Sequence, residues 1–266
     1  MQALLETRNL TRSFGFFTAV DKLDLQIDEG EIFALLGPNG AGKSTLIKML
    51  TTLLPPTSGE ARIDGFSITR EPNKVRRIIG YVPQMLSADS TLTGYENLFL
   101  FAKLYDIPRK EAKKRANEAI AFMDLGSFAH KLVRTYSGGM IRRLEIVQSM
   151  LHRPKVLFLD EPTIGLDPIG VKVVWEHILE LKRKYKTTIL LTTHIMEEAD
   201  KLCNRVALLS RGKLAVIGSP GALKASIGKK DATLEDVFIR YASESLANES
   251  SFREVRRERS TERRIG

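Results

Sequence analysis

The chain has 266 residues, 43% of them hydrophobic, and a formal net charge of +9. This length supports a substantial core in one or two compact lobes. Its single cysteine excludes an intramolecular disulfide framework and a zinc cluster. No apolar run approaches the roughly 18–20 residues of a membrane span, and no signal peptide is evident, so we expect a soluble or peripheral protein of a reducing compartment.

The positive charge has three possible explanations: a solvated basic surface, a face for anionic membranes, or a nucleic-acid interface. Basic residues are enriched at 109–115, at helical spacing. No aromatic residues that could stack on bases are interleaved with them. We therefore expect no nucleic-acid partner.

The first predicted elements are strands. Residues 4–10 and 23–27 alternate apolar with polar side chains, which is typical of half-exposed antiparallel strands. Residues 31–36 are an apolar run, typical of a buried parallel strand, and residues 44–53 have the composition of a helix.

A glycine-rich loop joins that strand to that helix. Residues 37–45 read Gly-Pro-Asn-Gly-Ala-Gly-Lys-Ser-Thr and match the phosphate-loop pattern G-x-x-x-x-G-K-[ST]. Glycines let backbone N–H groups surround phosphate oxygens, and the helix N-terminus adds about half a positive charge. Lys43 can bridge the β- and γ-phosphates, and Ser44 can ligate Mg²⁺. The predicted nucleotide-binding residues of this loop are Gly37, Pro38, Asn39, Gly40, Ala41, Gly42, Lys43, Ser44 and Thr45.

Farther along the chain, residues 60–68 predict a hairpin around an Asp-Gly turn, and residues 78–83 predict another strand. From residue 93 to about residue 130 the pattern is helical, with basic residues on the polar faces. We interpret this stretch as a helical lobe inserted into an α/β body.

A second glycine-containing helix start follows this lobe. Ser137 is a good N-cap for a helix predicted to run to about His152. Gly138 and Gly139 leave backbone N–H groups exposed, which is suited to binding an anion. Taken alone, the segment is equally compatible with a plain capped helix.

Residues 155–160 predict a buried strand that ends in the two acids Asp160 and Glu161. Burying carboxylates is costly unless a cation compensates them. Mg²⁺ held by nucleotide phosphates would be such a cation, with Asp160 binding the metal directly or through water. Glu161 could orient or deprotonate an attacking water.

The remaining elements alternate between helix and strand. Apolar residues within 171–181 recur at helix spacing and include Trp175, which we expect in the core. A strand at 188–192, a helix at 197–203 and a hairpin at 205–217 follow. This alternation predicts a mostly parallel sheet with helices on both faces.

Together these motifs resemble the nucleotide-binding subunit of an ATP-binding cassette (ABC) transporter. The match extends over residues 4 to about 240, with every major motif in order. The motifs are the Walker A loop at 37–45, the glutamine loop at 81–84, the signature at 136–140, Walker B at 156–160 followed by Glu161, the D-loop at 165–167 and the switch histidine at 192–194.

The resemblance implies a fold class and a division of the chain. The fold class is α/β: an ABC-type P-loop NTPase whose mostly parallel sheet carries an antiparallel β subdomain and an inserted helical subdomain. The ATPase domain would span residues 1–240, with the helical subdomain at about 88–134. Residues 241–266 would form a charged C-terminal tail.

The same resemblance implies roles for individual residues. Glu161 and His194 would be catalytic, although His194 taken alone would be an ordinary histidine at a strand end. Phe14 would lie under the adenine, with core packing as the alternative. Asp167 belongs to the D-loop. The implied metal ligands are Ser44, Gln84 and Asp160, and the signature residues acting across a dimer are Ser137, Gly138 and Gly139.

The chain departs from the common family pattern in a few places. Tyr136 and Met140 replace the ends of the usual Leu-Ser-Gly-Gly-Gln signature, Ile164 stands where serine is frequent, and Phe14 replaces a tyrosine. The Tyr-Ser-Gly-Gly-Met form and the segments at 142–145, 174–176 and 233–238 resemble the exporter branch that includes daunorubicin-resistance and nodulation-type ATPases.

The resemblance thus implies an Mg²⁺-dependent ATPase that powers a membrane transporter exporting a drug, lipid, other small molecule or polysaccharide. Its implied partners are transmembrane permease subunits and a second copy or a homologous ATPase, at the cytoplasmic face of the cell membrane. The alternatives are a soluble ABC ATPase, for example of the iron–sulfur assembly type, and a P-loop kinase or GTPase outside the family. The last leaves the signature and the switch histidine unexplained.

Overall fold

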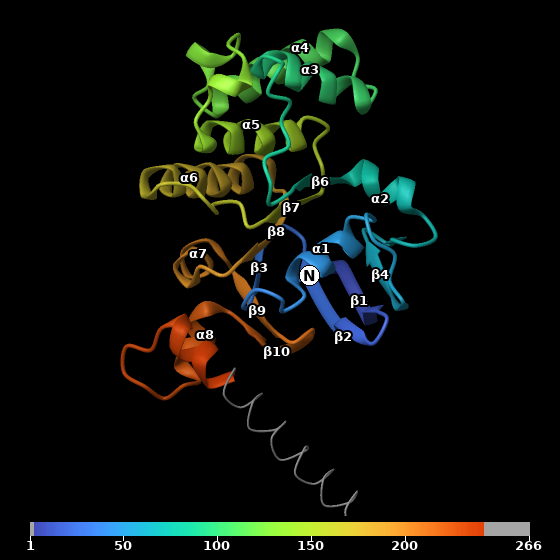
Figure 1. Ribbon diagram of the computed structural model, residues 1–266, viewed down its shortest axis with the longest axis vertical. Helices are drawn as coiled ribbons and strands as arrows, with labels where there is room; N and C mark the ends of the chain where they lie inside the picture. Colours follow the sequence, from blue (N-terminus) through green and yellow to red (C-terminus); the bar gives the residue numbers. More distant parts are fainter. Residues whose placement is uncertain (1–2, 242–266) are drawn as a thin grey trace, which may run out of the picture.

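Two β-sheets organise residues 3–241, the part of the chain that the computed structural model describes (Figure 1). The antiparallel sheet has the order β2-β1-β4-β5. Its strands are β1 (Ala3–Phe14), β2 (Phe17–Asp28), β4 (Ser58–Ile63) and β5 (Phe66–Ser67). The second sheet has the order β10-β9-β3-β8-β7-β6 and is parallel except for β10, which is antiparallel to β9. Its strands are β3 (Ile32–Leu36), β6 (Ile79–Val82), β7 (Val156–Asp160), β8 (Thr188–Thr193), β9 (Arg205–Ser210) and β10 (Lys213–Gly218).

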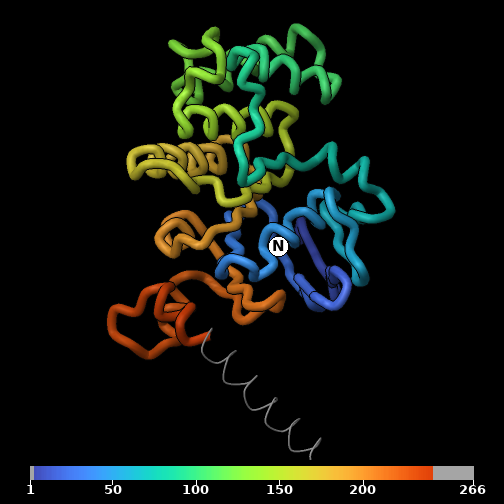
Figure 2. Tube along the Cα trace, viewed as in Figure 1, coloured from blue at the N-terminus to red at the C-terminus, as the bar shows by residue number. Residues whose placement is uncertain are grey.

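The helices form two groups around the parallel sheet. Between β6 and β7 the chain leaves the sheet, forms the upper helical layer and returns, as the trace in Figure 2 shows. That layer contains α3 (Gly94–Leu104), α4 (Arg109–Phe122), the short 3₁₀ turns η1 (Gly126–Phe128) and η2 (Val133–Thr135), and α5 (Gly138–Met150). The remaining helices are α1 (Lys43–Leu50), α2 (Pro72–Ile78), α6 (Pro168–Tyr185), α7 (Met196–Leu202) and α8 (Pro220–Ala225).

The central strand β3 shows how one sheet separates two hydrophobic cores. Successive side chains of a strand point to opposite faces. Phe33 and Leu35 pack in the core shared with α1 and the antiparallel sheet, whereas Ile32, Ala34 and Leu36 pack in the core shared with α5, α6 and α7. All five residues are buried, because both faces of the parallel sheet are covered, and the strand is therefore a continuous apolar run.

The predicted fold class is confirmed: the sheet is mostly parallel, an antiparallel sheet lies beside it, and helices are inserted between β6 and β7. The helix predicted at 44–53 ends earlier, at Leu50. The helices α2 and α8 were not predicted, because seven and six residues with one and two buried side chains carry little periodicity. The domain limits 1–240 and 88–134 remain predictions. Of the tail predicted at 241–266, residues 242–266 lie outside the described part of the chain.

A buried carboxyl connects α7 to α6 and to the loop after β7. Glu198 is fully buried, and its Oε1 accepts hydrogen bonds from Thr163 Oγ1 at 2.9 Å and from Trp175 Nε1 at 2.8 Å. Trp175 is therefore a core residue, as predicted, with its indole N–H satisfied. Burial raises the pKa of Glu198 above its ordinary value of 4.5, against the opposing effect of these hydrogen bonds.

This raised pKa predicts a pH-dependent stability that Glu198→Gln removes. Below pH 4.5 the carboxyl is neutral in both the folded and unfolded chain, so its burial carries no charge penalty. Between pH 4.5 and the raised pKa, the unfolded chain ionises while the folded chain keeps its proton, so the wild type loses about 1.4 kcal/mol of unfolding free energy for each pH unit by which the pKa is raised. Urea unfolding of both proteins from pH 5 to pH 8 should give a shallower decline for the variant.

The neighbouring Glu197 offers a matched control, because its carboxylate is exposed and pairs with Lys201 at 2.6 Å on the same helix. Glu197→Gln should keep the pH slope of the wild type. An unchanged slope in Glu198→Gln would contradict the assignment.

Candidate nucleotide-binding site

The loop between β3 and α1 adopts a conformation that depends on its glycines. Gly42 has φ +102° and precedes the first residue of α1. A Cβ at Gly42 would lie 2.3 Å from the Ala19 carbonyl oxygen, and one at Gly37 would lie 2.3 Å from that of Leu209. Only glycine allows the loop to pack this closely against β2 and β9, with its backbone turned around an open site.

The loop borders a cavity of about 360 Å³. Gln84 and Glu161 face it from the sheet side, and Phe17, Ala19 and Ile164 complete its lining. Of the predicted phosphate-loop residues, those that line the cavity are Asn39, Gly40, Ala41, Gly42, Lys43, Ser44 and Thr45. The phosphate loop, Gln84 and Glu161, predicted from three separate motifs, therefore meet at one cavity, whereas Asp160 and His194 do not line it.

Lys43 is the cation of this cavity wall. Its side chain is 4% exposed, and Nζ donates hydrogen bonds to the carbonyl oxygens of Gly37 at 2.7 Å and Pro38 at 3.2 Å. The same Nζ lies 3.6 Å from Glu161 Oε1. Burial lowers the pKa of Lys43, while the nearby carboxylates oppose that shift. Lys43 thus contacts two neutral carbonyls and the Glu161 carboxylate, and it lines the cavity in which an anion would lie over the loop.

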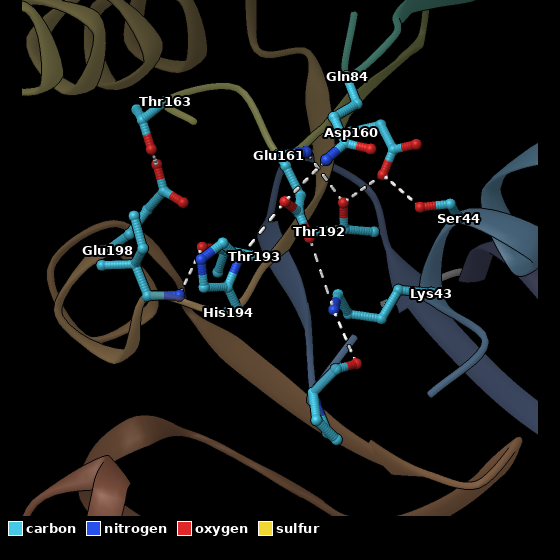
Figure 3. A network of polar contacts seen from close by, with 12 residues as sticks. Lys43, Ser44, Gln84, Asp160, Glu161, Thr163, Thr192, Thr193, His194 and Glu198 are labelled. Carbon is cyan, nitrogen blue, oxygen red and sulfur yellow. Dashed lines mark hydrogen bonds and ion pairs between the residues drawn. The ribbon is translucent and has the colours of Figure 1, made fainter. Parts of the chain in front are cut away.

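Asp160 is the last residue of β7, which lies between β8 and β6 in the parallel sheet. Its Oδ1 accepts hydrogen bonds from Thr192 Oγ1 at 2.6 Å and from Ser44 Oγ at 3.1 Å (Figure 3). Thr192 lies beside it because β7 and β8 pair in register at this position. The structure thus brings Ser44 and Asp160 together, as their predicted role as metal ligands requires.

Glu161 is the point at which the other motifs converge. It is 6% exposed, and its Oε2 accepts a hydrogen bond from Gln84 Nε2 at 3.2 Å and lies 3.4 Å from His194 Nδ1 (Figure 3). Its backbone has φ +48°, an unfavourable conformation for a residue with a side chain. The Glu161 N–H donates to Thr192 at both the carbonyl oxygen (3.1 Å) and Oγ1 (3.0 Å), which holds this turn in place.

The oxygen atoms at this site suit a hard cation such as Mg²⁺. Ser44 Oγ and Asp160 Oδ1 are within hydrogen-bond distance of each other, and Gln84 reaches the same strand end. Among residues 3–241, no group of three or more His, Cys, Asp and Glu side chains could hold a metal ion. Further ligands such as phosphate oxygens or water would therefore have to complete the coordination.

The signature lies at a different cavity. Ser137 caps α5 by accepting a hydrogen bond from the Met140 N–H at 3.3 Å, which confirms the predicted cap. Ser137, Gly138 and Gly139 line a second cavity of about 300 Å³, together with Asp167 of the D-loop. Asp167 in turn caps α6 by accepting a hydrogen bond from the Gly170 N–H at 2.7 Å. Because the two cavities share no lining residue, one chain does not bring its signature to its own phosphate loop.

Phe14, the aromatic residue expected under the adenine, lies outside the lining of the phosphate-loop cavity. Phe14 is 46% exposed, the Arg12 guanidinium lies 4.5 Å from its ring centre, and Phe14 does not line the phosphate-loop cavity. Its cross-strand partner Phe17 does line it. Stacking of Phe14 on adenine therefore remains a prediction.

Three residues that support the site were not predicted. Thr192 is a polar residue within a buried strand, a signal that could have identified it. Arg142 and Glu145 are both buried in α5 and contact the segment around Gln84. Their spacing on the helix carried no signal of this role, because their partners lie 57 to 59 residues away along the chain.

Known proteins share this sequence and architecture. A family model described as ABC transporter matches residues 20–164. The daunorubicin/doxorubicin resistance ATP-binding protein DrrA of Streptomyces peucetius is 45% identical over 224 residues, which are 84% of this chain and 68% of that protein. The Nod factor export ATP-binding protein I of Cupriavidus metallidurans is 39% identical over 84% of this chain and 73% of its own length.

Solved structures agree with these relatives. An ATP-binding subunit of an ABC transporter superposes with a TM-score of 0.80 and 30% identity, covering 90% of this chain and 99% of that chain. The ATP-binding cassette MJ0796, solved as a dimer in a post-hydrolysis state bound to ADP and Pi, has a TM-score of 0.72 and 28% identity, covering 81% and 98%. The motifs, the fold and these similarities together show that the chain belongs to the ABC transporter family.

Proposed function

We propose that this chain is the Mg²⁺-dependent ATP-hydrolysing subunit of a membrane exporter. The observation that carries the proposal is the convergence of Lys43, Gln84 and His194 on the Glu161 carboxylate beside the phosphate loop. Relatives named for daunorubicin resistance and Nod factor export support a drug, lipid, other small molecule or polysaccharide as cargo.

A permease partner and a peripheral position at the cytoplasmic membrane face are part of this proposal. Within the described part of the chain, no helix combines the length and apolarity needed to cross a bilayer. The path for the cargo would therefore be supplied by transmembrane subunits. A hydrophobic multi-span protein that co-purifies from detergent extracts would support transport, whereas a soluble partner alone would favour the alternative of a soluble ABC ATPase.

The chain's own residues suggest how hydrolysis would proceed. The loop N–H groups, the N-terminus of α1 and Lys43 would bind the phosphates. Bound Mg²⁺ would neutralise phosphate charge. Glu161 would accept the proton of the attacking water, and its contacts with Gln84 and Lys43 hold its carboxylate in place. His194 approaches that carboxylate and would orient it relative to the γ-phosphate.

A second copy of the chain, or a homologous ATPase, would complete each site. The signature residues lie at a cavity separate from the phosphate loop, and the related cassette MJ0796 forms a dimer. In a head-to-tail pair, Ser137, Gly138 and Gly139 of one chain would face the phosphates held by the other. The triphosphate charge would then hold the interface together, and hydrolysis would release it.

Glu161→Gln should abolish turnover while preserving nucleotide binding, because the amide cannot accept the proton of water. We expect the rate of phosphate release to fall by at least about 10²-fold, the usual contribution of a general base. Calorimetric titration with ATP and Mg²⁺ should still show binding. Glu197→Gln serves as the control for loss of a carboxylate, and retained turnover in Glu161→Gln would rule out the assigned role.

Lys43→Ala should weaken nucleotide binding itself, because it removes the buried ammonium beside the phosphate loop. A hydrogen bond to a charged group is worth about 1.5–3 kcal/mol, so the dissociation constant for ATP should rise roughly 10- to 100-fold. The control is Lys48→Ala, an exposed lysine on the same helix. Equal ATP affinities for Lys43→Ala and Lys48→Ala would contradict the proposed contact.

A further inference from the structure

Residues 83–88, the segment that contains Gln84, are hydrogen-bonded to two paired, buried side chains of α5. Arg142 and Glu145 lie one turn apart on this helix and are 1% and 4% exposed. Arg142 Nη1 and Glu145 Oε2 are 3.0 Å apart. Burying two charges is costly even when they are paired, and apolar residues could pack at the same positions at lower cost. The pair therefore calls for an explanation beyond packing.

Arg142 holds the segment on one side. Its Nη1 donates to the Pro83 carbonyl oxygen and its Nη2 to the Gln84 carbonyl oxygen, both at 2.7 Å. The planar guanidinium spans two successive carbonyls, which a single ammonium cannot do with the same geometry. The main chain at Gln84 is thus fixed at the point from which its side chain reaches Glu161 at 3.2 Å.

Glu145 holds the segment on the other side. Its Oε1 accepts hydrogen bonds from the backbone N–H of Ser87, from the Ser87 hydroxyl at 3.1 Å and from the Ala88 N–H at 3.1 Å. Between the two attachment points, Met85 and Leu86 are 82% and 48% exposed. The ion pair therefore fixes both ends of a short loop whose apolar middle is free of the core.

We infer that Arg142 and Glu145 are positioning residues that place Gln84 against Glu161 by fastening the glutamine loop to the signature helix. This inference rests on the proposed ATP hydrolysis. It also has a consequence for the paired chains. The N-terminus of α5 would serve the site of the opposite copy, whereas Gln84 serves the site of its own copy. The ion pair therefore links the signature of one site to the glutamine of the other within a single chain.

Two conservative variants test the attachment. Arg142→Lys keeps the positive charge but loses the planar guanidinium that spans two carbonyls. Glu145→Asp keeps the negative charge, but its shorter side chain withdraws the carboxylate from the loop. Arg115→Lys is a matched control, because Arg115 of α4 also binds a carboxylate (Glu111, 2.7 Å) and a backbone carbonyl (Leu151, 2.6 Å), but at the C-terminal end of α5.

Hydrogen–deuterium exchange of the nucleotide-free proteins gives a readout that does not depend on activity. The amides of Ser87 and Ala88 should exchange at least about 10-fold faster in Arg142→Lys and Glu145→Asp than in the wild type, because local opening exposes them. Arg115→Lys should keep the exchange rate of the wild type. Unchanged exchange in both test variants would overturn the inference.

Steady-state ATP hydrolysis tests the positioning role. Both variants should lose at least about 10-fold in kcat, with KM for ATP within about two-fold of the wild type and a melting temperature close to it, because the phosphate loop is untouched. A purely structural role would lower the melting temperature and raise KM together, and that result would contradict the inference, as would an unchanged kcat. A wild type without turnover would instead contradict the proposed function, while the exchange result would still decide whether the loop is fastened as described.

Discussion

The site depends on the burial of two carboxylates where β7 ends. Asp160 and Glu161 are 3% and 6% exposed, and burying ionised groups is unfavourable unless charges and donors compensate them. Lys43 comes from the start of α1, and hydroxyl donors come from Ser44 and Thr192. The carboxylates and the groups that compensate them therefore lie together at the carboxyl ends of β3, β7 and β8, beside the phosphate loop.

The same constraint connects the chemistry to the rest of the molecule. Gln84 contacts Glu161 from the segment that leads into the helical layer, and Arg142 and Glu145 attach that segment to the helix that begins with the signature. The buried carboxylates and α5 are therefore connected by a continuous series of hydrogen bonds and an ion pair. A bound triphosphate would add charge at this point, and a second signature helix would help to neutralise it.

The sequence predicted those parts of the site whose chemistry is local. The glycine loop, the Ser137 cap and the acid-terminated strand each follow from a few adjacent residues, and the structure has all three. Thr192 is recognisable as a polar residue within a buried strand, but its contact with Asp160, 32 residues away, depends on the register of β7 and β8. The partners of Arg142 lie 58 and 59 residues away along the chain, so its contacts could not be inferred from helical spacing. Phe14 and Phe17 face each other across a hairpin, and only the structure shows which of them lines the cavity.

The central claim is that a triphosphate is held between two copies of this chain. The most direct measurement is the solution mass of Glu161→Gln by light scattering, with and without saturating ATP and Mg²⁺. The account predicts one copy of 29.8 kDa without nucleotide and twice that mass with it. A mass of one copy in the presence of ATP, while calorimetry confirms that the nucleotide is bound, would contradict it.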